Sequence, residues 1–168
     1  MSSIDKINQL TKNDFSSIFG NVFEKTNWIA EKVYEHRPFL NFNDLCSKFL
    51  DLFKNETRER HLRILNFHPD LVVDKIMTKD SKIEQSSAKL DNCTKEEFDE
   101  FLNLNKDYKK KFNFPFIISV AKKNKIEILK KLKERIKNNE TIEFNEAIKQ
   151  VKKIASIRLE QIIKNIQI

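Results

Sequence analysis

The sequence predicts an all-α fold, a compact single-domain helical bundle of about eight helices in which residues 1–168 form one domain. Glycine occurs once and proline three times in 168 residues, which is too few for a turn-rich β architecture. Apolar residues recur every three or four positions between charged ones, as on helices that bury one face. The length suffices for a sizeable core.

The expected helices of the first half follow one another between recognisable start and stop residues. Candidate N-caps lie at 11–14 and 43–44, and Gly20 stands where a C-terminal glycine cap belongs. Pro38 breaks the chain between the third helix and the fourth. In chain order these helices are Ile4–Leu10, Asp14–Gly20, about 22–36, one carrying Leu45 to Phe53, and Glu56–Phe67.

His68 precedes Pro69, where the chain breaks and a short helix over Pro69–Met77 is expected. Proline suits the first position of a helix, which leaves His68 at or near the N-cap. There the positive end of the helix disfavours imidazolium, so the ring would be neutral near pH 7 and available as a base. A nearby carboxylate would act in the opposite direction and orient the ring. A turn residue without chemistry is the alternative.

Ser81 and Glu84 form a Ser-x-x-Glu pattern before an apolar helix, which is typical of a capping box. Capping accounts for both residues without any chemistry. It does not account for Gln85, which would share a helix face with Glu84.

A long amphipathic helix is expected from Lys95 into an aromatic corner, residues 112–116, of sequence Phe-Asn-Phe-Pro-Phe. Pro115 lacks an N–H group and disfavours a helical conformation in the residue before it, so the helix should end nearby. Asn113 tolerates a left-handed cap. The corner is either a hydrophobic plug or the wall of a pocket. Two more helices, about 117–138 and 141–166, are expected to follow.

Arg158 falls in the middle of the apolar stripe of the last expected helix. A buried guanidinium is costly unless a carboxylate, backbone carbonyls or an anionic ligand satisfies it. A structural ion pair, an arginine extended along the edge of the stripe, and a binding role are all compatible with this position.

The net charge of +7 arises entirely in residues 95–168, because residues 1–94 hold 14 basic and 14 acidic side chains. Such a basic half could attract nucleic acid or small anions, or could be a solvated helix face. No recognised nucleic-acid motif is present, and no apolar run approaches the roughly 18 residues of a membrane span. We therefore expect no nucleic-acid partner and no membrane partner.

The cysteines and histidines indicate neither a metal site nor a disulfide framework. Cys46 and Cys93 have no metal-ligand spacing, and the three histidines are isolated from one another. The N-terminus lacks the apolar core of a secretory signal. A reduced, cytoplasmic setting is expected.

Taken in order, several fragments resemble the OHCU decarboxylase family, the 2-oxo-4-hydroxy-4-carboxy-5-ureidoimidazoline decarboxylases. They are His-Pro-Asp-Leu at 68–71, Ser-x-x-Glu-Gln at 81–85, Leu-Asn-x-x-Tyr-x-x-Lys-Phe-x-Phe-Pro-Phe-Ile at 104–117, Arg-Leu at 158–159, and N-terminal matches at 18–24, 28–30 and 37–39. The resemblance extends from about Ser2 to Ile163.

The resemblance implies a cofactor-free, metal-free enzyme of urate breakdown, usually a homodimer, that converts its small-molecule substrate to (S)-allantoin with loss of carbon dioxide. It implies catalytic roles for His68 and Glu84. It implies substrate-binding roles for Pro69, Ser81, Gln85, Phe116, Ile117 and Arg158. In this chemistry His68, oriented by Glu84, could shuttle a proton, and Arg158 could hold the anionic substrate.

Two positions depart from the family pattern, which commonly has glycine where this chain has Lys89 and Asn113. Asparagine substitutes tolerably for a glycine with positive φ, whereas lysine does so less readily. A family member with lost or shifted activity on a related ureido or imidazoline compound is therefore an alternative. A basic helical interaction module is another.

Overall fold

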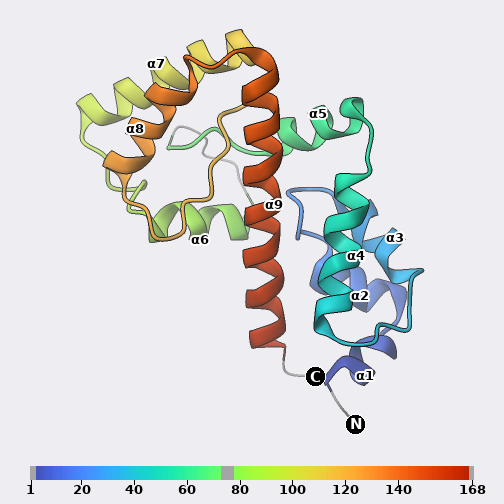
Figure 1. Cartoon of the computed structure of the whole chain (residues 1–168). Helices are drawn as coiled ribbons and strands as arrows, with labels where there is room; N and C mark the ends of the chain where they lie inside the picture. Colours follow the sequence, from blue (N-terminus) through green and yellow to red (C-terminus); the bar gives the residue numbers. More distant parts are fainter. Residues whose placement is uncertain (1–2, 73–77, 167–168) are drawn as a thin grey trace. The chain divides into compact units, whose positions relative to one another are not determined.

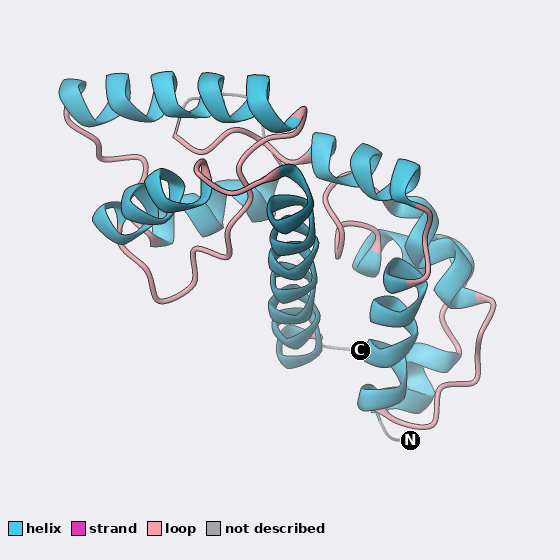
Figure 2. Cartoon of the chain, turned by 45° about the horizontal axis from the view of Figure 1, so that its top comes forward, coloured by secondary structure: helices cyan, strands magenta, loops and turns pink. Residues whose placement is uncertain are grey.

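The computed structural model describes residues 3–72 and 78–166, and within these ranges the regular elements are nine α-helices and no strands. This confirms the predicted all-α class (Figures 1 and 2). In chain order the helices are α1 (Ser3–Asn8), α2 (Lys12–Phe19), α3 (Asn27–Tyr34), α4 (Phe42–Lys54), α5 (Arg58–Phe67), α6 (Lys79–Ser87), α7 (Lys95–Phe112), α8 (Lys125–Arg135) and α9 (Glu140–Asn165). None of the described helices is both long and apolar enough to cross a membrane.

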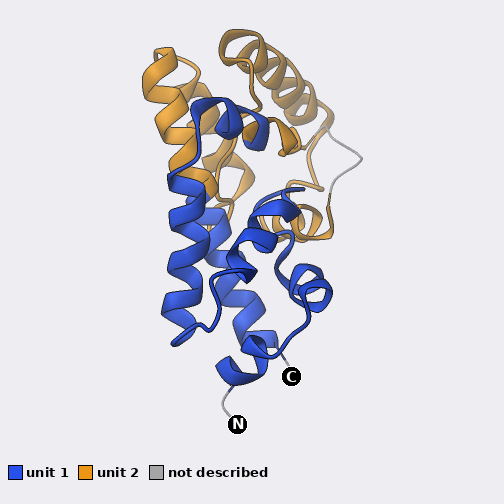
Figure 3. Cartoon of the chain, turned by 90° about the vertical axis from the view of Figure 1, so that its right-hand side faces the viewer, with its two compact units in different colours: residues 1–64, 152–168 blue, residues 65–151 orange. Residues whose placement is uncertain are grey.

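The chain divides into two compact units, of which one is discontinuous in sequence (Figure 3). Unit 1 comprises residues 1–64 and 152–168, and unit 2 comprises residues 65–151. Helices α5 and α9 each contribute residues to both units.

The core of unit 1 is built from phenylalanines spaced four residues apart on α2 and α4. Phe15 and Phe19 lie with ring centroids 4.6 Å apart, and both pack against Phe49. One turn further along α4, Phe53 stacks on Phe23 at 4.6 Å. Residues four apart share a helix face, so each helix buries its aromatic stripe against the other. Aromatic pairs of this kind add about 0.5–1.5 kcal/mol each beyond the area they bury.

The core of unit 2 gathers around Tyr108 on α7. Its ring contacts Phe112 at 4.7 Å, Phe116 at 5.4 Å and Phe114 at 6.0 Å, so three rings of the aromatic corner pack on one tyrosine. Phe114 also meets Phe144 of α9 edge to face.

Helix α7 confirms the predicted start and stop. Thr94 and Glu97 form a capping box at its start, and Asn113 at its end has φ 62° and ψ 21°, the predicted left-handed cap. Lys89, after α6, also has positive φ, at 58°. Both departures from the family pattern therefore lie where glycine would be the least strained residue.

Gly20 caps the C-terminus of α2, as predicted, with a right-handed φ of −64°, and its lack of a side chain matters because a Cβ there would lie 1.7 Å from Asn27 Oδ1. Two other local predictions were wrong. Residues 117–120, expected to begin a helix over about 117–138, form no regular secondary structure, and α8 starts only at Lys125. The helix α6 is capped by Thr78, so Ser81 and Glu84 do not form its capping box.

Candidate active site

His68 directly follows the last residue of α5 and is half-buried. Its N–H donates to the Leu65 carbonyl at 3.2 Å, which closes the final turn. Residues 69–72 are not helical, so the helix predicted to start at Pro69 does not start there, and its remainder lies outside the described residues. The helix start that was expected to keep the His68 ring neutral is therefore absent at this position.

The loop that carries His68, residues 68–72, is fixed by side chains of α6 and α7; we call it the His68 loop. Gln85 Oε1 accepts from the Val72 N–H at 3.0 Å, and Asn105 Nδ2 donates to the Leu71 carbonyl at 2.9 Å. Lys109, one turn after Asn105, pairs with Asp70 at 3.1 Å. Three consecutive residues are thus held from two helices.

Val72 holds a conformation that is rare for its side chain. Its φ is +72°, in the left-handed region, where a β-branched residue is a genuine outlier. Such strain costs on the order of 1–3 kcal/mol and persists only where the surroundings impose it. The amides of Gln85 and Asn105 supply that constraint.

Helix α6 buries Ser81 and Gln85 on one face, since they are four residues apart. Because Thr78 caps α6, Ser81 lies inside the helix, where it is buried, and Glu84 is half-buried. Capping therefore no longer accounts for these residue types.

Gln85 presents a buried donor. Its side chain is 7 % exposed, and Nε2 has no hydrogen-bond partner among the described residues. Only the amide oxygen can accept a hydrogen bond from the Val72 N–H, so the positions of Oε1 and Nε2 cannot be exchanged. The orientation of the Gln85 amide is therefore set. An unsatisfied buried donor costs about 1–3 kcal/mol, which a ligand carbonyl could recover.

The aromatic corner places its rings in the core of unit 2, where Phe114 and Phe116 are buried. Asn66 Nδ2 donates to the Asn113 carbonyl at 3.1 Å and anchors the start of the turn. Of the two alternatives, plug and pocket wall, the family resemblance favours the wall, but the side chains of the corner fill the core as a plug does. Any wall that the corner offers to a ligand therefore consists of its backbone and of the segment that follows.

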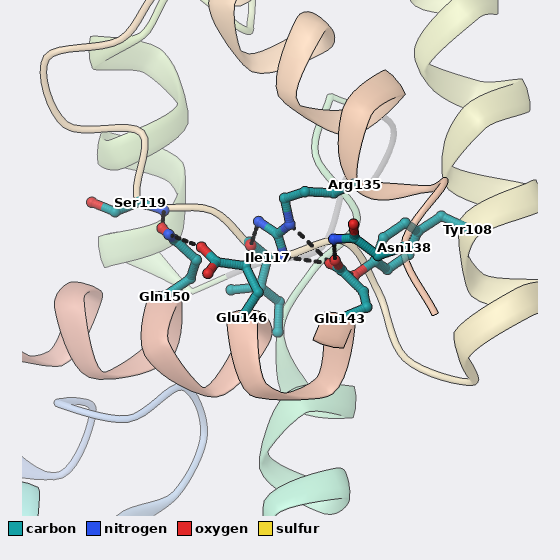
Figure 4. Close-up of polar contacts among 8 residues, drawn as sticks. All are labelled: Tyr108, Ile117, Ser119, Arg135, Asn138, Glu143, Glu146 and Gln150. Atoms are coloured by element: carbon teal, nitrogen blue, oxygen red, sulfur yellow. Dashed lines mark hydrogen bonds and ion pairs between the residues drawn. The ribbon is translucent and has the colours of Figure 1, made fainter. Parts of the chain in front are cut away.

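The segment after the corner is held by a buried polar network (Figure 4). Arg135 Nη1 donates to the Ile117 carbonyl at 2.7 Å, and its guanidinium lies 4.5 Å from the centre of the Phe116 ring. Two residues further on, the Ser119 N–H donates to Gln150 Oε1 at 2.9 Å. Side chains of α8 and α9 thus replace the hydrogen bonds that a helix would supply here.

Glu143 is the centre of this network and is fully buried. Its Oε1 accepts from Arg135 Nε and Nη2 at 2.9 and 2.6 Å and from the Tyr108 hydroxyl, and its Oε2 accepts from Asn138 at 2.8 Å. Burial, and next the hydrogen bond to Glu143, raise the pKa of Tyr108 far above its ordinary value. The hydroxyl therefore remains a donor at physiological pH.

Arg158 belongs to unit 1 and is 3 % exposed, which confirms its predicted burial. Its Nη2 lies 2.9 Å from Glu24 Oε2, and its Nη1 donates to the Asn21 carbonyl at 2.9 Å. The ion pair and the carbonyl satisfy the requirement that the sequence left open.

Unit 1 also contains a hollow of about 780 Å³ beside α2 and α3, lined by polar residues that include Ser16, Asn21 and Asn27. None of the predicted site residues lines it. One of its lining residues, Asn21, also accepts a hydrogen bond from Arg158 through its backbone carbonyl.

Of the predicted site residues, Gln85 contacts the His68 loop through its hydrogen bond with Val72. The backbone of the segment that contains Phe116 and Ile117 is held by Arg135 at the Ile117 carbonyl. These lie in unit 2, as do Pro69, Ser81 and Glu84. The orientation of His68 by Glu84, and the convergence of Arg158 with unit 2, remain predictions.

Four buried polar residues were not predicted from the sequence: Glu24, Asn105, Arg135 and Glu143. Asn105 carried a usable signal, because it lies on the apolar face of α7 between Phe101 and Tyr108, as Arg158 does on α9. Glu24 follows the apolar pair Val22-Phe23, a weaker signal. Arg135 and Glu143 are unremarkable in a lysine- and glutamate-rich sequence.

Comparison with known proteins identifies near-full-length relatives. Residues 8–160 match the family model described as OHCU decarboxylase. The chain is 33 % identical to the 2-oxo-4-hydroxy-4-carboxy-5-ureidoimidazoline decarboxylase of Haloferax volcanii, with 95 % of each chain covered. It is 36 % identical to that of Amia calva, covering 95 % of this chain and 93 % of the relative. It is also 35 % identical to the uric acid degradation bifunctional protein of Bacillus sp. (strain TB-90), but spans only 33 % of that protein.

Two solved structures share the fold. The crystal structure of (S)-allantoin synthase superposes with a TM-score of 0.78 at 23 % identity, over 96 % of this chain and 54 % of the other. The crystal structure of OHCU decarboxylase in the presence of (S)-allantoin gives a TM-score of 0.73 at 23 % identity, over 88 % of this chain and 99 % of the other.

Proposed function

This chain belongs to the OHCU decarboxylase family, and from that membership we propose that it converts 2-oxo-4-hydroxy-4-carboxy-5-ureidoimidazoline to (S)-allantoin in urate degradation. The observation that carries the proposal is the family match over residues 8–160, with relatives of the same length at 33–36 % identity. Residues 1–168 would act as a single domain of this family.

The reaction breaks the bond between the ring carbon and its carboxylate. Carbon dioxide leaves, the electron pair of that bond forms a double bond to the neighbouring ureido-bearing carbon, and the imine electrons move to the ring nitrogen, which takes up a proton. The ureido-bearing carbon is then protonated on one face, while the hydroxyl group on the first carbon loses its proton and becomes the carbonyl of allantoin. We assign acid–base catalysis to His68, with Glu84 orienting the ring; a positioned group of this kind contributes about 10²–10⁴-fold. The half-buried location of both side chains supports this assignment.

Substrate binding is assigned to the groups that the fold has fixed in advance. Gln85 Nε2 is a buried donor with a set orientation, suited to a carbonyl of the ureido group or ring, and Ser81 lies on the same helix face. Pro69 belongs to the His68 loop. Phe116 and Ile117 offer backbone groups to the substrate. Because Arg135 already holds this segment, little conformational entropy is lost when the substrate binds.

Arg158 is proposed to attract the anionic substrate, in addition to its ion pair with Glu24. In a site that excludes water, hydrogen-bond donors stabilise the negative charge that develops in the transition state more strongly than the same donors do in solution. We further infer a cytoplasmic homodimer that requires neither metal nor cofactor, as the family resemblance implies.

The test is freshly generated substrate followed by circular dichroism for the appearance of chiral allantoin. The wild-type chain should accelerate formation of the (S) enantiomer, and His68→Asn at equal concentration should not. A wild-type rate equal to spontaneous decay would favour the alternative of a family member whose activity is lost or shifted to a related ureido compound.

A further inference from the structure

We propose that Asn105 is a positioning residue for the decarboxylation, acting through the peptide group between Leu71 and Val72; this rests on the function proposed above. The carbonyl that Asn105 binds and the N–H that Gln85 binds belong to the same peptide group. The C=O and N–H of a trans peptide point in opposite directions. The two amides therefore grip this peptide plane from its two edges.

This grip selects one of two orientations of the plane. Rotation of the peptide group by half a turn would present a carbonyl oxygen to Gln85 Oε1 and an N–H to Asn105 Nδ2, so both hydrogen bonds would be lost. The positive φ of Val72 is strained, and the loop would otherwise relax toward a less strained conformation. Asn105 and Gln85 together prevent that relaxation.

Stability alone does not account for asparagine at this position. Its side chain is 3 % exposed, and with Nδ2 committed to Leu71, Oδ1 has no hydrogen-bond partner among the described residues. A buried unsatisfied acceptor costs about 1–3 kcal/mol. Its neighbours on this face of α7, Phe101 and Tyr108, are large and buried.

The orientation of the peptide group between Leu71 and Val72 affects two residues of the proposed site, Gln85 and His68. Gln85 must keep Oε1 on the Val72 N–H, so the orientation of the peptide group decides where Nε2 points. His68 lies three residues before the gripped peptide. Loss of Asn105 is therefore expected to raise KM through Gln85 and to lower kcat through His68.

The test uses Asn105→Leu, which removes the donor at similar volume, and Asn105→Asp. We expect Asn105→Leu to lower kcat/KM at least 10-fold with helicity retained. A carboxylate cannot donate to the Leu71 carbonyl, whereas a protonated carboxyl can. The activity of Asn105→Asp relative to wild type should therefore rise as pH falls from 8 to 5.5, a dependence that a merely structural role would not produce.

Asn8→Leu is the matched control, because Asn8 Nδ2 also donates to a backbone carbonyl at 2.9 Å, that of Phe39 in unit 1. It should lower the melting temperature and leave kcat/KM unchanged. The inference is overturned if Asn105→Leu keeps kcat/KM within twofold of wild type. It is also overturned if Asn105→Asp shows the same pH profile as wild type. The second measurement decides the question if Asn105→Leu fails to fold. An inactive wild type would instead count against the proposed function.

Discussion

Lys89 and Asn113 both adopt a left-handed backbone, but at different cost. The conformation costs a side chain with a Cβ roughly 1–2 kcal/mol, less for asparagine, whose side chain can hydrogen-bond locally. At Lys89 it is imposed by the end of α6, where the Leu90 N–H reaches back to the Gln85 carbonyl at 3.0 Å in a Schellman-type closure. The expected glycines are thus explained by helix termination.

Lys89→Gly should therefore raise the free energy of unfolding by about 1 kcal/mol, because glycine relieves the strain at positive φ. Urea denaturation followed by circular dichroism measures it. Lys82→Gly, on the exposed face of α6, is the control and should lower stability by about 1 kcal/mol. Equal losses in both variants would contradict the strain argument.

At the level of elements, one carboxylate joins three helices of unit 2. Glu143 of α9 accepts hydrogen bonds from Arg135 of α8 and Tyr108 of α7, and Arg135 in turn holds the Ile117 carbonyl (Figure 4). The helices that build the core are therefore the same ones that fix the backbone proposed to bind substrate.

Tyr108 gives this network a measurable pH dependence. Because its pKa is raised in the folded protein, the unfolded chain loses the phenolic proton first, above about pH 10. Stability contributed by Tyr108 is therefore complete below pH 10 and declines above it, by up to about 1.4 kcal/mol per pH unit. Tyr108→Phe should be less stable than wild type at pH 7 and show a shallower decline between pH 10 and 11.5.

Denaturant unfolding at fixed pH values measures this difference, and Tyr34→Phe serves as the control that keeps the steeper decline. Identical slopes for wild type and Tyr108→Phe would show that the buried hydroxyl does not govern the transition.

At the scale of the whole molecule, the ion pair of Glu24 with Arg158 joins positions 134 residues apart and closes unit 1. Removing one partner of a buried pair costs about 3–5 kcal/mol, whereas replacing both with apolar residues of similar volume is often neutral. This difference can separate a structural role of Arg158 from a role in binding.

We expect Arg158→Met and Glu24→Met each to be destabilised by about 3–5 kcal/mol, and the double variant to recover most of that loss. If Arg158 also binds the substrate, the double variant should remain folded but show a strongly raised KM. Wild-type kinetics in a stable double variant would restrict Arg158 to its ion pair. Thermal unfolding and the allantoin assay measure the two properties.

The sequence was informative where local rules decide the structure. The helix over Lys95–Phe112 and its left-handed end at Asn113 follow from caps and periodicity, and the burial of Arg158 follows from its place in an apolar stripe. The residues proposed to form the active site were recognised from sequence fragments that resemble the family.

The sequence was less informative where distant side chains replace backbone hydrogen bonds. Residues 117–120 looked helical, but Arg135 and Gln150 satisfy their backbone from α8 and α9. The His68 loop likewise depends on Gln85 and Asn105, which lie 13 and 34 residues beyond their partners. Local periodicity contains no information on such pairings.

The discontinuity of unit 1 has a consequence for biosynthesis. At about 5–20 residues per second, a ribosome adds Arg158 roughly 7–27 s after Glu24. Unit 2 is one uninterrupted stretch, residues 65–151, and is complete before Arg158 exists. The nascent N-terminal segment must therefore wait, with its core incomplete, until the buried Ala155 and Leu159 of unit 1 have been made. This interval is when the protein would most need a chaperone.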